Sequence, residues 1–343
     1  MAKKKKQISF ATFNLFNLQL PGKAMYEGKK PYSKAQYKRK IGWTADVLSR
    51  LQPDVIGFQE LWSPQCLKDA FQQAGLLANY SLVASSNKNG ISNALAIRKP
   101  ATIVKSQWIS SFPSELVLKK ARGKSGEPDY QMAVNIKRFS RPVLRATIRP
   151  AGDNTLPNIV TCIAHLKSKL PIRLDANLPA AAKRHRDAIG GALATIRRTS
   201  EAAALRVILD KITRGTSTPA VVMGDLNDAQ LSVTTSLITS QPTLHLVSSS
   251  RAGHRSDRGL YSAAVLQELR SLRDVYYTHI HKGLRESLDH ILVSEQFYDY
   301  SDNRVWSFNE MRIINDHLDD ENPEASDHGV VLAVFDHNPV KKT

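Results

Sequence analysis

The sequence predicts a mixed-sheet α/β fold in a single domain. Short aliphatic or β-branched runs alternate with longer segments of helical spacing, but without the strict strand–helix–strand rhythm of a purely parallel sheet. The chain has 343 residues, of which 42% are hydrophobic, which is ample for a sizeable buried core. No fixed-period repeat and no Gly/Ser-rich or Pro-rich linker divides it. We expect a basic disordered tail over residues 1–7, one domain over residues 8–336 and a tail over residues 337–343.

The first part of the chain begins with an expected strand over residues 7–18, where apolar and polar residues alternate and β-forming residues dominate. Ser33 is placed to cap a helix that Pro53 closes, and a short apolar strand follows over residues 55–58. Further strands are expected where short aliphatic runs are bounded by turn residues, at residues 94–98, 143–148, 159–164 and 220–223.

The later part of the chain contains one long expected helix, over residues 180–212. Its apolar positions repeat at helical spacing and are Ile189, Leu193, Ile196, Ala203, Val207 and Ile212. Most of its arginines, including Arg198 and Arg206, are expected to form a solvated charged face. The last two strands and the acidic loop between them are expected at residues 288–293, 330–335 and 316–324.

The charge of the chain points to a polyanionic partner. With 48 Lys and Arg against 31 Asp and Glu, the formal net charge is +17, which favours nucleic acid or an acidic membrane surface. Residues 1–40 carry eleven basic residues and one acid, whereas residues 301–343 carry nine acids and four basic residues. The segment over residues 119–149 adds nine basic residues against two acids. The basic side is therefore not formed by the C-terminal segment.

Neither a membrane span nor a secretory signal is expected. No apolar run approaches the roughly 18 residues that a spanning helix needs, and the basic residues 1–6 lead into a strand-like stretch instead of an apolar signal core. Cys66 and Cys162 are too few for a disulfide framework or a cysteine-built zinc site. We expect a cytoplasmic protein with two reduced thiols and no stable membrane insertion.

Polar and ionisable residues stand where several of the apolar runs stop. They are Asn14, Glu60, His165, Asp225 with Asn227, and Asp327 with His328. Asp289 instead lies inside the apolar run over residues 288–291. A charged residue in an apolar strand is costly unless it is paired or binds a metal. Asp289 therefore needs a partner, and His328 is the natural candidate.

These residues fall into short motifs in a fixed order. Behind Gln59-Glu60 come Gly224-Asp225-Leu226-Asn227, Leu288-Asp289-His290-Ile291 and Ser326-Asp327-His328. With this order the sequence resembles the endonuclease/exonuclease/phosphatase superfamily, the fold of DNase I, AP endonucleases and neutral sphingomyelinases, from Ile8 to Phe335. The resemblance implies a four-layer α/β sandwich, with two mixed β-sheets packed face to face and helices on both outer sides. It also implies a site at one end of the sandwich.

A hard cation is expected beside Glu60. Phosphodiester hydrolysis needs a cation that neutralises charge on the phosphate oxygens, and Mg²⁺ prefers one or two carboxylates with amide oxygen and water. Glu60 fits as the main ligand, and the resemblance implies that Asn14 and Asp327 lie beside the ion, directly or through water. Mg²⁺ is the expected cofactor, with Mn²⁺ as the alternative. Phe16 stands where many relatives carry a second polar ligand, so one metal is favoured over two.

The catalytic roles implied by the resemblance fall on five residues. Asp225 is positioned to orient and deprotonate the attacking water, and Asn227 to hold the phosphate or the nucleophile. His328 would bind the phosphate opposite the metal, with Asp289 accepting its other ring proton and stabilising the imidazolium. His165 resembles the second histidine of the DNase I and sphingomyelinase branches, which contacts the phosphate or aids the leaving group.

Three further residues are expected to contact the substrate. Arg141 resembles a DNase I arginine that touches the DNA backbone, Lys167 follows His165 closely enough to meet a phosphate, and Asn93 completes the set. AP endonucleases place a tyrosine-containing turn where this chain has Ala164-His165-Leu166. General phosphodiester cleavage is therefore better supported than damage-specific incision.

Two other features have plainer interpretations. His279 and His281 alternate along an expected strand over residues 275–280 and are assigned to a solvent-facing side, not to a metal site. The apolar cluster over residues 108–112 fits either insertion into lipid or a buried strand.

The superfamily hydrolyses nucleic acids, phosphoinositides, sphingomyelin and smaller phosphoesters with the same set of site residues. The substrate must therefore be inferred from the residues around the site. The net charge and Arg141 favour a metal-dependent nuclease, with DNA preferred over RNA. The alternative is a lipid phosphodiesterase or phosphatase of the sphingomyelinase or inositol-phosphatase type, whose lysines would meet acidic head groups. A noncatalytic nucleic-acid-binding module is disfavoured, because it has no need of a buried Asp paired to a histidine. Endonuclease and exonuclease action both stay open, as does the oligomeric state.

Overall fold

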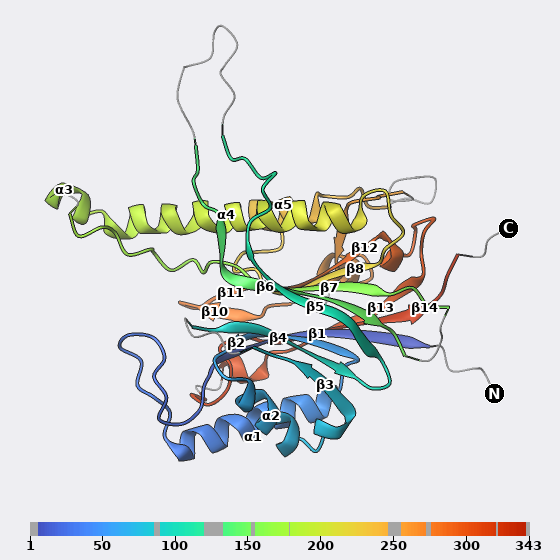
Figure 1. Ribbon diagram of the computed structural model, residues 1–343, viewed down its shortest axis with the longest axis horizontal. Coiled ribbons are helices and arrows are strands. Elements are labelled where there is room, and N and C mark those ends of the chain that lie inside the picture. The colour runs from blue at the N-terminus through green and yellow to red at the C-terminus, as the bar shows by residue number, and fades with distance from the viewer. Residues whose placement is uncertain are drawn as a thin grey trace, which may run out of the picture.

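Two mixed β-sheets pack face to face in the computed structural model, each with six strands in the part of the chain that is described (Figure 1). The first sheet has the order β13-β14-β1-β2-β4-β3, formed by β1 (Gln7–Leu18), β2 (Val55–Leu61), β3 (Tyr80–Val83), β4 (Ser92–Arg98), β13 (Trp306–Ile314) and β14 (Val330–His337). The second has the order β5-β6-β7-β8-β12-β9, formed by β5 (Thr102–Ser111), β6 (Arg138–Arg149), β7 (Ile159–His165), β8 (Ala220–Asp225), β9 (Leu260–Ser262) and β12 (Asp289–Ser294).

The structure describes residues 6–85, 90–119, 133–151, 155–177, 179–245, 255–271, 276–319 and 322–340. Most of the predicted N-terminal tail and the last three residues of the predicted C-terminal tail lie outside these ranges. β1 begins at Gln7 and β14 ends at His337, each one residue beyond the limits expected for the domain.

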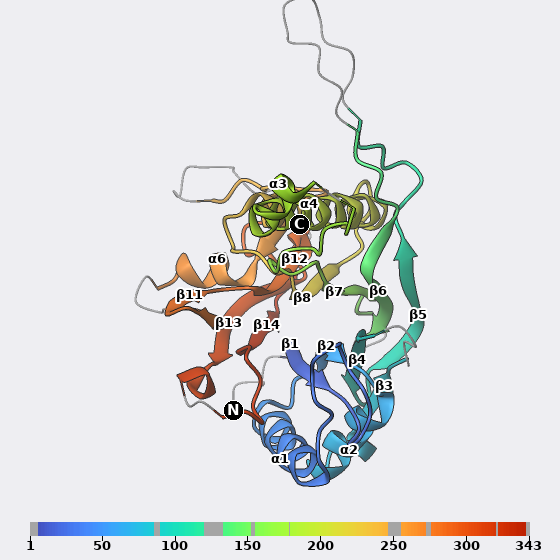
Figure 2. The same ribbon diagram turned by 90° about the vertical axis from the view of Figure 1, so that its left-hand side faces the viewer.

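Helices cover the outer face of each sheet, as Figures 1 and 2 show. The first sheet is covered by α1 (Lys34–Leu51) and α2 (Pro64–Gln73), and the second by α4 (Arg186–Thr213) and α5 (Val233–Thr239). Shorter elements are α3 (Ala180–Lys183), α6 (Ala263–Glu268) and the 3₁₀ turns η1 (Leu77–Asn79), η2 (Glu295–Phe297) and η3 (Asp316–Asp319). The predicted four-layer α/β sandwich is confirmed. Among the described residues, no helix combines the length and the apolar character needed to cross a membrane.

The central apolar layer lies between the two sheets. It includes Phe10 and Val55 from the first sheet and Ile163 and Met223 from the second. At Gly57 the sheets approach closely, because a Cβ built there would lie 3.0 Å from side-chain atoms of Ile163 and 3.1 Å from Met223. The missing side chain therefore lets β2 pack directly on β7 and β8.

The predicted first helix is confirmed as α1, and its N-terminus has the expected cap. The hydroxyl of Ser33 accepts a hydrogen bond from the backbone N of Gln36 at 3.2 Å, and the Gln36 side chain accepts one from the backbone N of Ser33 at 2.9 Å. This reciprocal pair is a capping box. Ile41 and Leu48 are buried on the face that packs against the first sheet.

The long helix predicted over residues 180–212 is instead two helices, because Arg184 and His185 form a turn between α3 and α4. The predicted apolar face of this helix is wrong at Leu193 and Ile196, which are exposed, whereas Ile212 is buried as expected. The buried face of α4 is rotated from it and includes Ala194, Ala202, Leu205, Ile208 and Leu209.

Two arginines that were assigned to a solvated face of α4 are buried. The guanidinium of Arg198 lies 3.2 Å from a carboxylate oxygen of Asp228, and Arg206 donates a hydrogen bond to the Ile238 carbonyl at 2.7 Å. These partners replace the water that a solvated arginine would have.

Strand β13 was missed from the sequence. β13 lies between β12 and β14, the two strands that were expected last. The acidic segment begins after β13, at η3, so it does not connect β12 directly to β14. The expected strand over residues 275–280 is shorter in the structure, where β10 (His279–His281) pairs with β11 (Leu284–Glu286); Val275 lies outside the described residues.

The apolar cluster over residues 108–112 is half-buried, in and directly after the edge strand β5. Trp108 and Ile109 lie in β5, and Phe112 follows directly after it. Trp108 packs against the central apolar layer, whereas Ile109 and Phe112 pack against the layer between the second sheet and α4. The cluster is therefore part of the packing of the fold.

Gly57→Val is expected to lower the free energy of unfolding by about 1–3 kcal/mol, because the added side chain meets Ile163 and Met223 where the sheets approach. Gly191→Ala is the matched control. Gly191 lies in α4 with open space around its Cα, so alanine should raise stability by about 0.5–1 kcal/mol through helix propensity. Urea unfolding followed by circular dichroism measures both, and an unchanged stability of Gly57→Val would contradict the close approach of the sheets.

Candidate active site

Three neighbouring strands of the second sheet place ionisable side chains in one row. His165 lies opposite Asp225 in the parallel pair β7–β8, and Asp289 lies opposite Asp225 in the antiparallel pair β8–β12. Paired positions share one face of a sheet, so the strand register alone brings the three side chains together. Gly224 is required before Asp225, because its φ is +149° and a Cβ would lie 1.8 Å from the Ala164 carbonyl oxygen.

Asp225 is buried at the centre of the site. Its Oδ1 accepts a hydrogen bond from the backbone N of Asn227 at 2.8 Å, and its Oδ2 accepts one from Nδ2 of Asn14 at 3.2 Å. The Nε2 atoms of His165 and His328 lie 3.3 and 3.8 Å from the same Oδ2. One carboxylate oxygen therefore faces an amide and two imidazoles, as expected if these residues act on one substrate group.

His328 and Asp289 form the buried pair that the sequence predicted. Nδ1 of His328 donates a hydrogen bond to Oδ2 of Asp289 at 2.7 Å, and both side chains are buried. The backbone N of His328 donates to Oγ of Ser326 at 3.0 Å, and that hydroxyl donates to the Asn14 carbonyl at 2.7 Å. Ser326 therefore ties the loop that carries His328 to strand β1.

The strand pairing of β1 and of β2 is interrupted at neighbouring positions, and these interruptions set the position of Glu60. The register of the β1–β2 pair shifts after Asn14, and that of the β2–β4 pair shifts after Phe58. Asn17 and Glu60 have φ of 58° and 60°, and the backbone N of Asn17 donates to Oε2 of Glu60 at 2.9 Å. Bulges and left-handed non-glycine residues of this kind redirect side chains and cluster at functional sites.

Asp225 and Glu60 have raised pKa values. Burial raises the pKa of Asp225 to about 7, the charge of His328 opposes this, and the Asp289 carboxylate adds to it. Burial also raises the pKa of Glu60, and the neighbouring Asp327 carboxylate raises it further. A carboxyl group with a pKa near neutrality is well matched to accept a proton at neutral pH, which suits Asp225 to the role of a general base.

The two imidazoles of the site carry different charges. Burial lowers the pKa of His165 well below its usual value, and the positive charges of Arg141 and His328 lower it further. Burial alone would do the same to His328, but the Asp289 and Asp225 carboxylates outweigh it and hold the pKa of His328 well above the usual range. At neutral pH His328 is therefore an imidazolium and His165 a neutral imidazole.

The donor set around Glu60 fits a hard divalent cation. The carboxylates of Glu60 and Asp327 and the amide oxygen of Asn14 are the ligand types that Mg²⁺ and Mn²⁺ prefer. The charge of Asp327 raises the pKa of Glu60, and a cation between two such carboxylates would relieve their repulsion.

Two other clusters meet the spacing of a metal site. Candidate ligand atoms lie within 4.8 Å of one another in Asp225–Asp289–His328 and in His279–Asp327–His328. Both clusters share His328, whose imidazolium already supplies positive charge to the acids around it. We therefore keep Glu60, Asn14 and Asp327 as the predicted metal ligands.

Arg141 and Asn227 meet at one backbone carbonyl beside His165. Nη1 of Arg141 and Nδ2 of Asn227 both donate to the Leu166 carbonyl, at 3.0 and 3.1 Å. The charge of Arg141 also lowers the pKa values of His165 and Glu60. The structure thus brings Arg141 to the edge of the site, as the sequence predicted for a substrate contact.

Lys167 and Asn93 lie near the site, and the side-chain nitrogen of each already donates a hydrogen bond to a backbone carbonyl. Nζ of Lys167 donates to the Leu170 carbonyl at 3.0 Å, so this side chain turns back onto its own loop. Asn93 is buried beside the β2 bulge, and its Nδ2 donates to the Pro142 carbonyl at 2.8 Å. Among the described residues, Oδ1 of Asn93 has no hydrogen-bond partner. Their roles as substrate ligands stay predictions.

Buried charges on α4 support the site from behind, and sequence analysis missed them. Glu201 accepts hydrogen bonds from the backbone N of Ser140 at 2.7 Å and from that of Lys167 at 2.8 Å. Arg198 donates to the Lys167 carbonyl at 3.4 Å and pairs with Asp228. These contacts fix the segments next to Arg141 and His165. The signal in the sequence was the helical spacing that Arg198 and Glu201 share with the buried residues of α4.

Lys40 is a second supporting charge that the sequence did not reveal. It is buried in α1, donates to the Ala325 carbonyl at 3.5 Å, and holds its Nζ 5.2 Å from the centre of the Phe16 ring. Burial lowers its pKa to about 8, while the Asp327 carboxylate opposes that shift. Lys40 therefore places positive charge behind the acidic side of the site.

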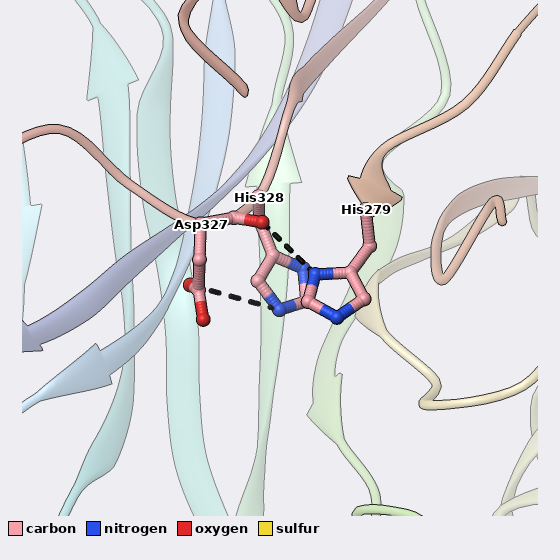
Figure 3. Close-up of side chains that lie close together, drawn as sticks. All are labelled: His279, Asp327 and His328. Carbon is pink, nitrogen blue, oxygen red and sulfur yellow. Dashed lines mark hydrogen bonds and ion pairs between the residues drawn. The ribbon is translucent and has the colours of Figure 1, made fainter. Parts of the chain in front are cut away.

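His279 lies against His328, as Figure 3 shows. The two ring centres are 5.0 Å apart, and Nδ1 of His279 donates to the Asp327 carbonyl at 2.9 Å. The solvent-facing assignment is therefore wrong for His279, whereas His281 is exposed. Beside Asp327, a hollow of ≈ 190 Å³ is lined in part by Phe16 and Ile280.

Comparison with solved structures finds the same fold. A D. rerio TDP2 structure complexed with a single-strand DNA product is 15% identical, with a TM-score of 0.56 over 96% of this chain and 99% of that one. The human Nocturnin catalytic domain with a bound sulfate anion is 17% identical, with a TM-score of 0.54 over 97% and 95% of the two chains. An endonuclease/exonuclease/phosphatase from Bacteroides vulgatus is 18% identical, with a TM-score of 0.54 over 97% and 100%.

At these identities the structural likeness establishes the fold alone. No curated protein matches the sequence. A sequence model of the Endonuclease/Exonuclease/phosphatase family matches residues 11–328, which contain all the site residues predicted above. Members of this family are metal-dependent hydrolases that act on phosphodiester bonds. With the fold, the row of His165, Asp225 and Asp289, and the match over nearly the whole length, the chain belongs to the Endonuclease/Exonuclease/phosphatase family.

Proposed function

We propose that the protein is a metal-dependent phosphodiesterase that hydrolyses nucleic acid, with DNA favoured. The proposal rests on one observation: a carboxylate that can accept a proton and an imidazolium that can bind a phosphate are buried side by side in one site. Asp225, with a pKa raised to about 7, is suited to take a proton, and it lies 3.8 Å from the imidazolium of His328, which is suited to bind a phosphate.

Glu60, with Asn14 and Asp327, would hold the metal, and Mg²⁺ is proposed with Mn²⁺ as the alternative. When bound, such a cation neutralises charge on the phosphate oxygens and polarises the bond to phosphorus. The backbone N of Asn17 donates to one oxygen of Glu60, which fixes the carboxylate in the orientation that a ligand needs.

The side chains on the other side of the phosphate would accept the proton of the attacking water and bind the phosphate. Asp225 accepts the proton of the attacking water, and its two oxygens are held by Asn227 and Asn14. His328 donates from Nε2 to a phosphate oxygen, while Asp289 holds Nδ1 and stabilises the positive charge. His165 is neutral and sits 3.3 Å from Asp225, where its ring contacts the phosphate or the leaving oxygen.

Charge and a structural neighbour support nucleic acid as the substrate. The formal charge of +17 favours a long polyanion, and Arg141 lies at the edge of the site. The D. rerio TDP2 structure, which shares this fold, contains a single-strand DNA product. The apolar cluster that could favour the lipid alternative, Trp108 and its neighbours, is half-buried and packs in part against the core. A cytoplasmic location is also proposed, supported by the buried and unpaired thiols of Cys66 and Cys162.

Asp225→Asn is expected to slow nicking of supercoiled plasmid about 10²–10⁴-fold, the usual contribution of a general base. Folding and polyanion binding should stay nearly intact, because the change removes a proton acceptor and little volume. The assay compares wild type and variant with Mg²⁺ and with a chelator, and Asp187→Asn, an exposed acid on α4, is the matched control. A variant that retains most of its activity would remove Asp225 from the role of base.

The same preparations are tested for release of phosphocholine from sphingomyelin and of phosphate from phosphoinositides. Metal-dependent nicking that Asp225→Asn abolishes establishes the nuclease. Release from a lipid without nicking would overturn nucleic acid as the substrate and keep the site residues in their proposed roles.

Glu60→Gln is expected to raise the Mg²⁺ concentration needed for half-maximal activity at least about tenfold, because the site loses one carboxylate charge. Part of the lost activity should return at high Mg²⁺. The measurement is a Mg²⁺ titration of activity, with Glu115→Gln, an exposed acid that pairs with Lys211, as the control. A loss that is equal at every Mg²⁺ concentration would contradict the assignment of Glu60 as a ligand.

A further inference from the structure

The hairpin formed by β10 and β11 is fastened to the loop that carries His328. His279, the first residue of β10, forms an antiparallel bridge with His328, and the backbone N of Gly329 donates to the Thr278 carbonyl at 2.7 Å. Thr278 also accepts hydrogen bonds at its hydroxyl from the backbone N of Asp289, at 3.2 Å. Thr278 and His279, at the start of the hairpin, therefore contact the backbones of both members of the His328–Asp289 pair.

The side chain of His279 is fixed at one ring nitrogen. Nδ1 lies 2.9 Å from the Asp327 carbonyl oxygen, which can only accept, so the proton is on Nδ1. The carbonyl thereby sets the orientation of the imidazole. Figure 3 shows the ring of His279 beside the ring of His328 and next to Asp327.

The fixed ring of His279 covers one face of the His328 ring. The ring centres are 5.0 Å apart, and the ring planes meet at 30°. The bond from Nδ1 of His328 to Asp289 holds the ring at one edge, which still permits the plane to tilt about that bond. A second ring packed on its face removes this freedom and keeps water from that side.

We propose that His279 is a positioning residue, which by stacking holds the His328 ring at the angle that directs Nε2 to the phosphate. The inference rests on the proposed function of His328. His279 has two contacts through which it could act, the bond from Nδ1 to the Asp327 backbone carbonyl and the stacking of its ring on His328. A variant that keeps the ring without the nitrogen separates the two.

Three variants test the proposal: His279→Ala removes the ring, His279→Phe keeps a ring without the nitrogen, and His281→Ala is the matched control. His281 lies on the same strand, is exposed, and has its ring centre 6.4 Å from that of His279. Thermal unfolding of each variant shows whether the hairpin change disturbs the fold.

Activity is measured with bis(p-nitrophenyl) phosphate and Mg²⁺, a phosphodiester that needs no nucleic-acid contacts. His279→Ala should lower kcat about 10- to 100-fold with little change in KM, because a misplacement of ~1 Å can cost 10²-fold. His279→Phe keeps the stacked ring but not the bond to the Asp327 carbonyl, so it should recover part of that loss. His281→Ala should match wild type. Equal losses in all three variants, or Phe no better than Ala, would overturn the stacking role.

A second readout does not depend on catalysis. The proton shared by Nδ1 of His328 and Oδ2 of Asp289 should give a resolved downfield proton resonance, assigned by its loss in Asp289→Asn. His279→Ala should shift or broaden it, and His279→Phe should leave it close to wild type. An unchanged resonance in His279→Ala would overturn the proposal. If wild type cleaves no phosphodiester, the proposed function fails, and this spectrum still decides whether His279 positions His328.

Discussion

The site depends on burying carboxylates beside one another. Asp225 and Asp289 occupy paired positions on adjacent strands and are both buried. A buried carboxylate costs free energy unless a charge or hydrogen bonds replace its water. The imidazolium of His328 compensates both acids, and amides of Asn14 and Asn227 donate to Asp225. The fold therefore has to bring β1, β8, β12 and the loop before β14 to one point.

Buried charges on the outer helices also stabilise the segments around the site. On one side, Glu201 of α4 accepts hydrogen bonds from the backbones of Ser140 and Lys167. On the other, Lys40 of α1 places a buried ammonium behind Asp327. Each of these charges is itself buried, so the hydrogen bonds to it are shielded from water. The two sheets position the reacting groups, and the two helical layers hold the loops around them.

Much of the fold could be predicted, because the strand signal is local. A short β-branched run bounded by turn residues identifies β2, β7 and β8 without knowledge of their neighbours. Asp289 and His328 could be paired because a lone acid inside an apolar run requires a partner. The face of α4 could not be predicted, since its alanines and arginines permit more than one apolar side and the partners of Arg198 and Glu201 come from distant loops. The position of His279 depends on how a hairpin docks onto another loop, which no local pattern records.

Strand β14 lies between β1 and β13 in the first sheet, although every other strand precedes it in the chain. During synthesis, one edge of β1 therefore stays unpaired until β14 has left the ribosome. An unpaired strand edge can pair wrongly with another strand. His328 precedes β14 by two residues and arrives at the same moment. Closure of the first sheet and formation of the His328–Asp289 pair are thus one event, so an unfinished chain that stops before His328 has neither the β1–β14 pairing nor this buried pair.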